Sequence, residues 1–135
     1  MIKTYVDSGI LIAAARGNGR LSIRALEVLR ESDAREFVSS DYIKMEVLPK
    51  PTYFGRDAEI KFYSAYFSTV TEWWNFDSAH LEAAFEEACR AGLQAYDAIH
   101  VTIAAMSGCE ELITTEKPTA AIHRTSLIRI VSIDA

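Results

Sequence analysis

The sequence predicts a three-layer α/β/α protein with a mainly parallel sheet of four to five strands. Short β-favouring runs at residues 2–6, 35–40, 111–114 and 127–133 alternate with segments of helical periodicity. Strands separated by helices need crossover connections, which give parallel pairing and place helices on both faces of the sheet. With 135 residues, 50% of them hydrophobic, the chain can form one domain around its own core, and we expect a single domain over 1–135.

The N-terminal third predicts two strands and two helices. The apolar run from Ile2 to Val6 ends at Asp7, and a short helix is expected from Ser8 to Ala15, before a glycine-containing loop at 17–19. Residues 21–32 form an amphipathic pattern that predicts a second helix. The run REFVSS then predicts the second strand.

Four further helical patterns follow. Ser40 is a suitable N-cap for a helix over 41–48, which should stop near Pro49 and Pro51. Apolar residues keep helical spacing over 60–70 and again over 81–88, and we expect these two helices to pair with each other. The last helix covers 95–107 and precedes the third predicted strand.

Composition restricts the classes of function. The net charge of −5 argues against strong nonspecific attraction to polyanions, although a sum can conceal a local basic patch. No apolar stretch approaches the roughly 18 residues that a membrane helix needs, and the N-terminus has no signal-peptide pattern. We therefore expect a cytoplasmic protein without a membrane partner.

Two acids follow predicted strands. Asp7 comes directly after the first strand and Glu116 follows the strand ELIT. Ligands of such sheets bind beyond the carboxyl ends of the strands, near the point where strand order reverses. A simpler interpretation stays open for each acid, because Asp7 could cap the helix that starts at Ser8 and Glu116 could be an exposed turn residue.

Two more acids lie on predicted helices. Glu46 borders the apolar stripe of its helix, near a C-terminus that disfavours anions, although a solvated glutamate would also fit this position. Asp97 shares a face with Val101 and Ala104 in a helix that is apolar almost all round. It also lies in the first turn, where the helix dipole favours aspartate, so a structural role remains open.

Taken together, four segments resemble the signature segments of PIN-domain ribonucleases in order and approximate spacing. They are YVDSGILIA at 5–13, SSDYIKMEVL at 39–48, YDAIHVTIAAMSG at 96–108 and ELITTEK at 111–117. The resemblance covers nearly the whole chain and is strongest to the small toxins of VapC type. It implies a PIN-like fold and a metal-dependent endoribonuclease of a type II toxin-antitoxin pair.

The resemblance assigns the acids to one site. Asp7, Glu46 and Asp97 take the three regular acidic positions, and Glu116 takes the fourth, where the family more often has aspartate. Ser8 and Thr114 match small hydroxyl residues that support a ligand or a bound water. Two carboxylates about 4 Å apart repel by about 4 kcal/mol at an effective dielectric constant of about 20, so such a cluster needs cations. Hard oxygen donors suit Mg²⁺ or Mn²⁺.

We expect Asp7 and Asp97 to contact the metal directly. Glu46 is then a further ligand or orients the attacking water, and Glu116 completes a second, weaker metal position. The resemblance implies cleavage of RNA that leaves a 5′-phosphate and a 3′-hydroxyl.

Other polar and aromatic residues are assigned more simply. His100 and His123 are expected in packing or capping contacts outside the site. The aromatic residues of FYSAYF and EWWNF are expected in the core or in an oligomer contact. Cations that could bind the substrate, although each also fits a solvated surface, are Arg16, Arg20, Lys44, Lys50 and Arg56.

The sequence also leads to expectations about binding partners, and two alternative functions stay open. The resemblance implies a cognate antitoxin that covers the acidic edge, inserting an arginine in place of the metal charge, and a homodimer formed through helical faces. One alternative is a noncatalytic PIN-fold module that binds RNA or protein. Another is a phosphoacceptor receiver domain, since EKP at 116–118 resembles its lysine and proline, but that class requires paired acids after the first strand, where this chain has Asp7 alone.

Overall fold

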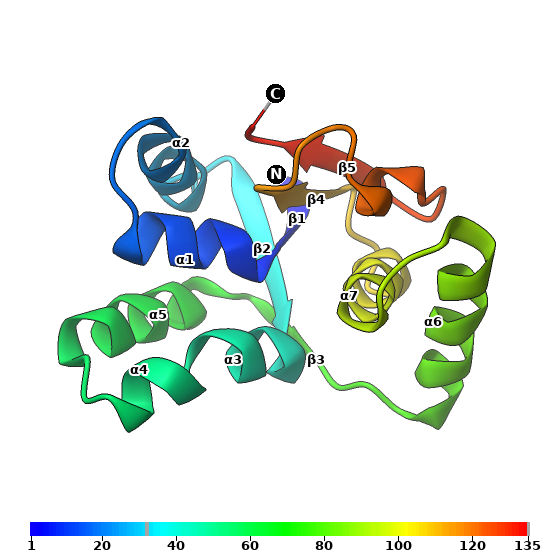
Figure 1. The fold of residues 1–135 in the computed structure, drawn as a ribbon, viewed down its shortest axis with the longest axis horizontal. Coiled ribbons are helices and arrows are strands. Elements are labelled where there is room, and N and C mark those ends of the chain that lie inside the picture. The colour runs from blue at the N-terminus through cyan, green and yellow to red at the C-terminus, as the bar shows by residue number, and fades with distance from the viewer. Residues whose placement is uncertain (32, 135) are drawn as a thin grey trace.

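A computed structural model describes residues 1–31 and 33–134 and shows five strands among helices (Figure 1). In chain order the elements are β1 (Ile2–Val6), α1 (Ser8–Arg16), α2 (Arg20–Leu29), β2 (Arg35–Ser40), α3 (Asp41–Val47), α4 (Pro49–Tyr53), α5 (Asp57–Thr69), β3 (Glu72–Trp74), α6 (Ser78–Ala91), α7 (Ala95–Met106), β4 (Glu111–Thr114), the 3-10 helix η1 (Ala121–Arg124) and β5 (Arg129–Ser132). The predicted α/β class is confirmed.

All neighbouring strands pair in parallel, in the order β3-β2-β1-β4-β5. Helices α1 to α5 lie on one side of the sheet and α6 and α7 on the other, which gives the three predicted layers (Figure 1). Strand order reverses at β1, so the ends of β1 and β4 flank the switch point where ligands of such sheets bind. Receiver domains have the order 2-1-3-4-5, so this topology also argues against that alternative.

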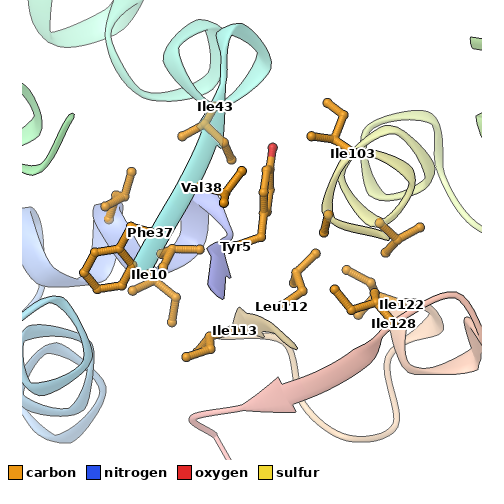
Figure 2. Packing of buried hydrophobic residues seen from close by; sticks show 14 of the residues in the cluster. Tyr5, Ile10, Phe37, Val38, Ile43, Ile103, Leu112, Ile113, Ile122 and Ile128 are labelled. Atoms are coloured by element: carbon orange, nitrogen blue, oxygen red, sulfur yellow. The ribbon is translucent and has the colours of Figure 1, made fainter. Parts of the chain in front are cut away.

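The core lies on both faces of β1, β2 and β4. Figure 2 shows the ring of Tyr5 between Val38 on β2 and the helix that carries Ile103, with the hydroxyl oxygen pointing away from Leu112 on β4. Tyr5, Val38 and Leu112 are completely buried. A tyrosine this deep in a sheet needs a partner for its hydroxyl, and that partner belongs to the candidate site.

The predicted pairing between the helices over 60–70 and 81–88 is wrong. Helix α5 packs against α1 and α4, whereas α6 packs against α7 on the other side of the sheet (Figure 1). Periodicity identifies the apolar stripe of a helix but does not say which face of the sheet it covers. The predicted end of α2 at residue 32 lies outside the described residues, and among the residues described no helix is long and apolar enough to span a bilayer.

Two short elements, α4 and β3, were not among the clearly predicted helices and strands. Pro49 does end α3, but it also occupies the first turn of the short helix α4, where a missing N–H costs nothing. The sequence EWW forms the edge strand β3, which adds the fifth strand to the sheet. Only three residues long, β3 is too short for an alternating pattern to reveal it.

Candidate active site

Asp7 lies at the end of β1 and at the start of α1. One carboxylate oxygen accepts a hydrogen bond from the Ser8 amide at 2.8 Å, which makes Asp7 the N-cap of α1. The other oxygen accepts from the Thr114 hydroxyl at 3.0 Å. The capping role and a role in the site are therefore compatible, because the helix start holds the carboxylate at the switch point. Helix α1 can pack closely against Thr115 because residue 9 is glycine, since the Thr115 side chain leaves no room for a Cβ at that position.

Asp97 lies in the first turn of α7, as predicted, and is partly buried. Burial raises the pKa of Asp97, and the nearby carboxylates of Asp7, Glu116 and Glu46 raise it further. Burial likewise raises the pKa of Asp7, with a smaller contribution in the same direction from Glu46. The four acids predicted from distant segments thus lie close enough to interact electrostatically.

Glu46, near the end of α3, uses both carboxylate oxygens within the site. The Ser8 hydroxyl donates to one oxygen at 3.3 Å, and Nε2 of His100 contacts the other. His100 lies on α7 and is 1% exposed. The imidazole lowers the pKa of both Asp7 and Asp97, and so partly offsets the repulsion among the acids.

A buried hydrogen-bond chain extends from His100 into the sheet. The Tyr5 hydroxyl lies 2.8 Å from Nδ1 of His100 and 2.8 Å from the hydroxyl of Ser40. Ser40 ends β2 and is the N-cap position of α3, but its side chain makes no capping bond and joins Tyr5 instead. The chain connects β1, β2 and α7 to the carboxylate on α3, and it orients the imidazole towards Glu46.

Glu116 is anchored through its backbone. The Glu116 amide donates to the Thr114 hydroxyl at 3.1 Å, and the Ser132 hydroxyl donates to the Glu116 carbonyl at 2.6 Å. Thr114 therefore joins two of the acids, since the same hydroxyl donates to Asp7. The side chain of Glu116 is exposed, which leaves the carboxylate free to approach an ion or a substrate.

The predicted cations have other partners or are exposed. Arg16 pairs with Glu59 at 3.6 Å, Lys44 lies over the ring of Trp73, and Arg56 lies over Phe54. Arg20 and Lys50 are exposed on α2 and α4. In the described part of the chain, none of the five makes a hydrogen bond or ion pair with the four acids. Their role in binding RNA stays a prediction.

The acids fit a divalent ion held by few protein ligands. No three His, Cys, Asp or Glu side chains within residues 1–31 and 33–134 converge closely enough to bind one ion together. Mg²⁺, however, commonly uses one or two carboxylates and keeps several waters. Asp7 and Asp97 provide two such carboxylates, and burial, which is the main cause of their raised pKa values, disfavours their charged forms unless a cation is bound. The Ser8 hydroxyl and Nε2 of His100 hold the carboxylate of Glu46 in a fixed orientation, which suits it to position a water.

The residues that the sequence analysis missed are His100, Tyr5 and Ser40. The sequence predicts His100 in a packing or capping contact outside the site; the side chain is buried, but it also contacts a predicted site acid. One signal was available, because His100 comes three residues after Asp97 and therefore lies on the same face of the helix. No pattern in the sequence marks the hydroxyl of a core tyrosine as part of a site.

Comparison with known proteins identifies a family and a shared fold. A family model of the PIN domain matches residues 4–122. The structure of VapBC2 from Rickettsia felis, bound to a promoter DNA fragment, has a chain that is 11% identical, with a TM-score of 0.74 and coverage of 97% of this chain and 98% of that one. A chain of DNA-bound VapBC from Salmonella typhimurium is 19% identical, with a TM-score of 0.73 and coverage of 98% and 99%.

A third similar structure is FitAcB from Neisseria gonorrhoeae, with 11% identity, a TM-score of 0.64 and coverage of 96% of this chain and 97% of that chain. At these identities the solved structures establish a shared fold. A search of curated proteins found no match.

Proposed function

The chain belongs to the PIN-domain family, and from this premise we propose that it is a divalent-metal-dependent endoribonuclease acting in the cytoplasm. The observation that carries the proposal is that Asp97 lies within electrostatic reach of Asp7, Glu46 and Glu116, beside the carboxyl ends of β1 and β4. A single acid there has a structural explanation. Four acids from separate segments, two of them with raised pKa values, are what a cation site requires.

Each acid has a role in the proposed reaction. Asp7 and Asp97 would hold Mg²⁺ or Mn²⁺, and Glu46, oriented by His100 and Ser8, would position the attacking water and accept its proton. Glu116 would complete a second, weaker metal position. When bound, such an ion lowers the pKa of a coordinated water and stabilises charge on the phosphate and the leaving oxygen. No side-chain nucleophile is needed, and the products carry a 5′-phosphate and a 3′-hydroxyl.

We further propose that the protein is the toxin of a toxin-antitoxin pair. Similarity in fold to chains of two VapBC structures, one bound to a promoter DNA fragment and the other to DNA, and to a chain of FitAcB supports this proposal. The cognate antitoxin would cover the acidic edge and place a cation there in place of the metal. A homodimer is proposed on the resemblance alone. Co-expression with the product of a neighbouring short reading frame tests the pair, because the antitoxin should restore growth and co-purify with the chain.

Cleavage of a labelled single-stranded RNA tests the catalytic proposal. We expect cleavage in Mg²⁺ or Mn²⁺, none in excess chelator, and loss of activity by at least about a hundredfold in Asp97→Asn. Glu27→Gln removes a carboxylate from the exposed face of α2 and should cleave like the wild type. Cleavage that persists in chelator or in Asp97→Asn would remove the mechanism.

A noncatalytic PIN module is the second candidate. It is favoured by one observation, which is that no three potential ligands among the described residues converge on a common point. RNA binding without cleavage in either metal would support it.

A further inference from the structure

Three aromatic side chains from distant segments meet beside the acids, and we refer to them as the aromatic cluster: Tyr42, Phe76 and Tyr96. The ring centroids of Tyr42 and Phe76 are 5.3 Å apart at an interplanar angle of 77°. Those of Tyr42 and Tyr96 are 6.5 Å apart at 59°. Tyr96 is 51% exposed, so much of its side chain is available to a ligand.

The aromatic cluster borders the proposed site on two helices. Tyr96 precedes Asp97 on α7, and its ring stacks on that of His100 with centroids 6.5 Å apart. Tyr42 lies four residues before Glu46 on α3, which is about one helical turn, or about 5.4 Å along the axis. A chain bound with a phosphodiester at the acids would therefore bring an adjacent nucleotide to these rings.

A cavity of about 310 Å³ opens beside the aromatic cluster. It is lined by Asp41, Tyr42, Met45, Asn75 and Phe76. The ring faces offer stacking, and the amide of Asn75 offers both a donor and an acceptor to the edge of a base. On the same stretch of α3, the ammonium of Lys44 lies 5.3 Å from the ring centroid of Trp73, where a cation can meet a backbone phosphate.

We propose that this cavity and the ring of Tyr96 form a base-binding subsite, which takes a nucleobase of single-stranded RNA next to the scissile phosphodiester. The inference rests on the proposed function, since it places the base relative to the proposed reaction. Stacking of the base on Tyr96 and Tyr42 provides affinity for any sequence, because every base has a π-face. Asn75 reads the edge of the base and gives the site its sequence preference.

Tyr96→Ala tests the stacking, with Tyr53→Ala as the matched control. Tyr53 is 83% exposed on α4 and lies outside the subsite. Loss of a stacked base should raise KM about tenfold in Tyr96→Ala while kcat changes little, whereas Tyr96→Trp should keep the wild-type KM. Tyr53→Ala should behave like the wild type. Equal KM values for Tyr96→Ala and Tyr53→Ala would overturn the subsite.

Oligonucleotides with one abasic nucleotide locate the base. For the wild type, one abasic position next to the cleaved bond should weaken binding about tenfold, and Tyr96→Ala should be indifferent to that position. Asn75→Ala should alter which base is preferred there. If every abasic position affects the two proteins equally, the subsite is wrong.

Binding to an oligonucleotide with noncleavable linkages separates this inference from the proposed function. If the wild type binds in a Tyr96-dependent manner but never cleaves RNA, the subsite stands and the nuclease proposal fails. If the wild type cleaves RNA but Tyr96→Ala binds as tightly, the nuclease stands and the subsite fails. Absence of any binding to single-stranded RNA overturns the subsite.

Discussion

The hydroxyl of Tyr5 lies 2.8 Å from Nδ1 of His100, and both side chains are buried. This contact determines how the imidazole is turned and leaves Nε2 against the carboxylate of Glu46. A core residue of β1 thus orients an acid on α3 through a histidine on α7. Groups that orient a catalytic carboxylate in this way are typically worth 10–100-fold in metal affinity or activity.

We therefore predict that His100→Leu lowers RNA cleavage by about 10–100-fold, because Glu46 loses its oriented partner. His100→Gln should recover part of that activity, since the amide can still donate to Glu46. A role limited to packing would instead make the leucine variant the more active of the two. Steady-state cleavage rates, compared at temperatures well below each melting point, distinguish these outcomes.

Tyr5→Phe is predicted to lower both activity and stability. Removal of the hydroxyl leaves Ser40 and Nδ1 of His100 without this partner in a buried position, at a cost of about 1–3 kcal/mol. The matched control is Tyr66→Phe, because the buried Tyr66 hydroxyl has no hydrogen-bond partner among the described residues. Urea denaturation should show a loss of stability only for Tyr5→Phe. Equal stabilities would mean that the hydrogen-bond chain contributes nothing.

Metal-free stability should depend on pH through Asp7 and Asp97. Burial raises the pKa of each in the folded state above the ordinary value of about 3.9. The folded state then holds protons that the unfolded state has released. Stability from these groups is thus fully present below the ordinary pKa and is lost as the pH rises through the folded-state pKa.

The measurement compares wild type with the Asp7→Asn/Asp97→Asn double variant in chelator from about pH 3.5 to 7.5. Other carboxylates show the opposite shift, since Lys3 lowers the pKa of Glu72, but they are common to both proteins and cancel in the difference. We expect the variant to gain stability relative to wild type as pH rises. Added Mn²⁺ should raise the melting temperature of wild type only. A difference curve that is flat with pH would contradict the raised pKa values of the two acids.

Apolar periodicity and position in the chain predict most strands and the long helices of this fold. Strands β1, β2, β4 and β5 and the long helices follow from apolar patterns, and the end of β1 identifies Asp7. The strand β3 and the partners of α5 and α6 were not predictable in the same way. A three-residue edge strand has no period, and the side of the sheet that a helix covers depends on how the crossovers run.

In the site, too, some residues have a sequence pattern that reveals them, whereas others are recognised only from the tertiary structure. Acids are conspicuous in apolar segments, so Asp7 and Asp97 could be found from their neighbours in the sequence. Tyr5 could not, and His100 had only its helical spacing from Asp97 as a signal, because a histidine and a tyrosine in apolar surroundings are ordinary core residues until a third group is brought to them. That group, Glu46, lies 54 residues before His100 and meets it only through the fold.

A separate prediction concerns stability away from the site. Glu87 on α6 is 5% exposed and accepts two hydrogen bonds from Arg90 at 2.7 Å and one from Thr125 at 2.5 Å. Arg90→Met should leave the carboxylate short of partners and destabilise the protein by about 1–3 kcal/mol in urea denaturation. RNA cleavage below the melting transition should be unchanged. Arg30→Met, at the exposed end of α2, is the control.

Glu116 provides the last prediction. Its backbone is held by Thr114 and Ser132, whereas its exposed side chain makes the carboxylate the most weakly constrained of the four. Glu116→Gln should therefore reduce cleavage less than Asp97→Asn, by about tenfold, and the loss should shrink as Mn²⁺ is raised, as expected for a weaker second metal position. Glu116→Asp should stay active, because the carboxylate is kept and the backbone anchors are unchanged. Metal titrations of cleavage for the three proteins measure this, and a loss in Glu116→Gln that is equal at all metal concentrations would assign Glu116 to another role.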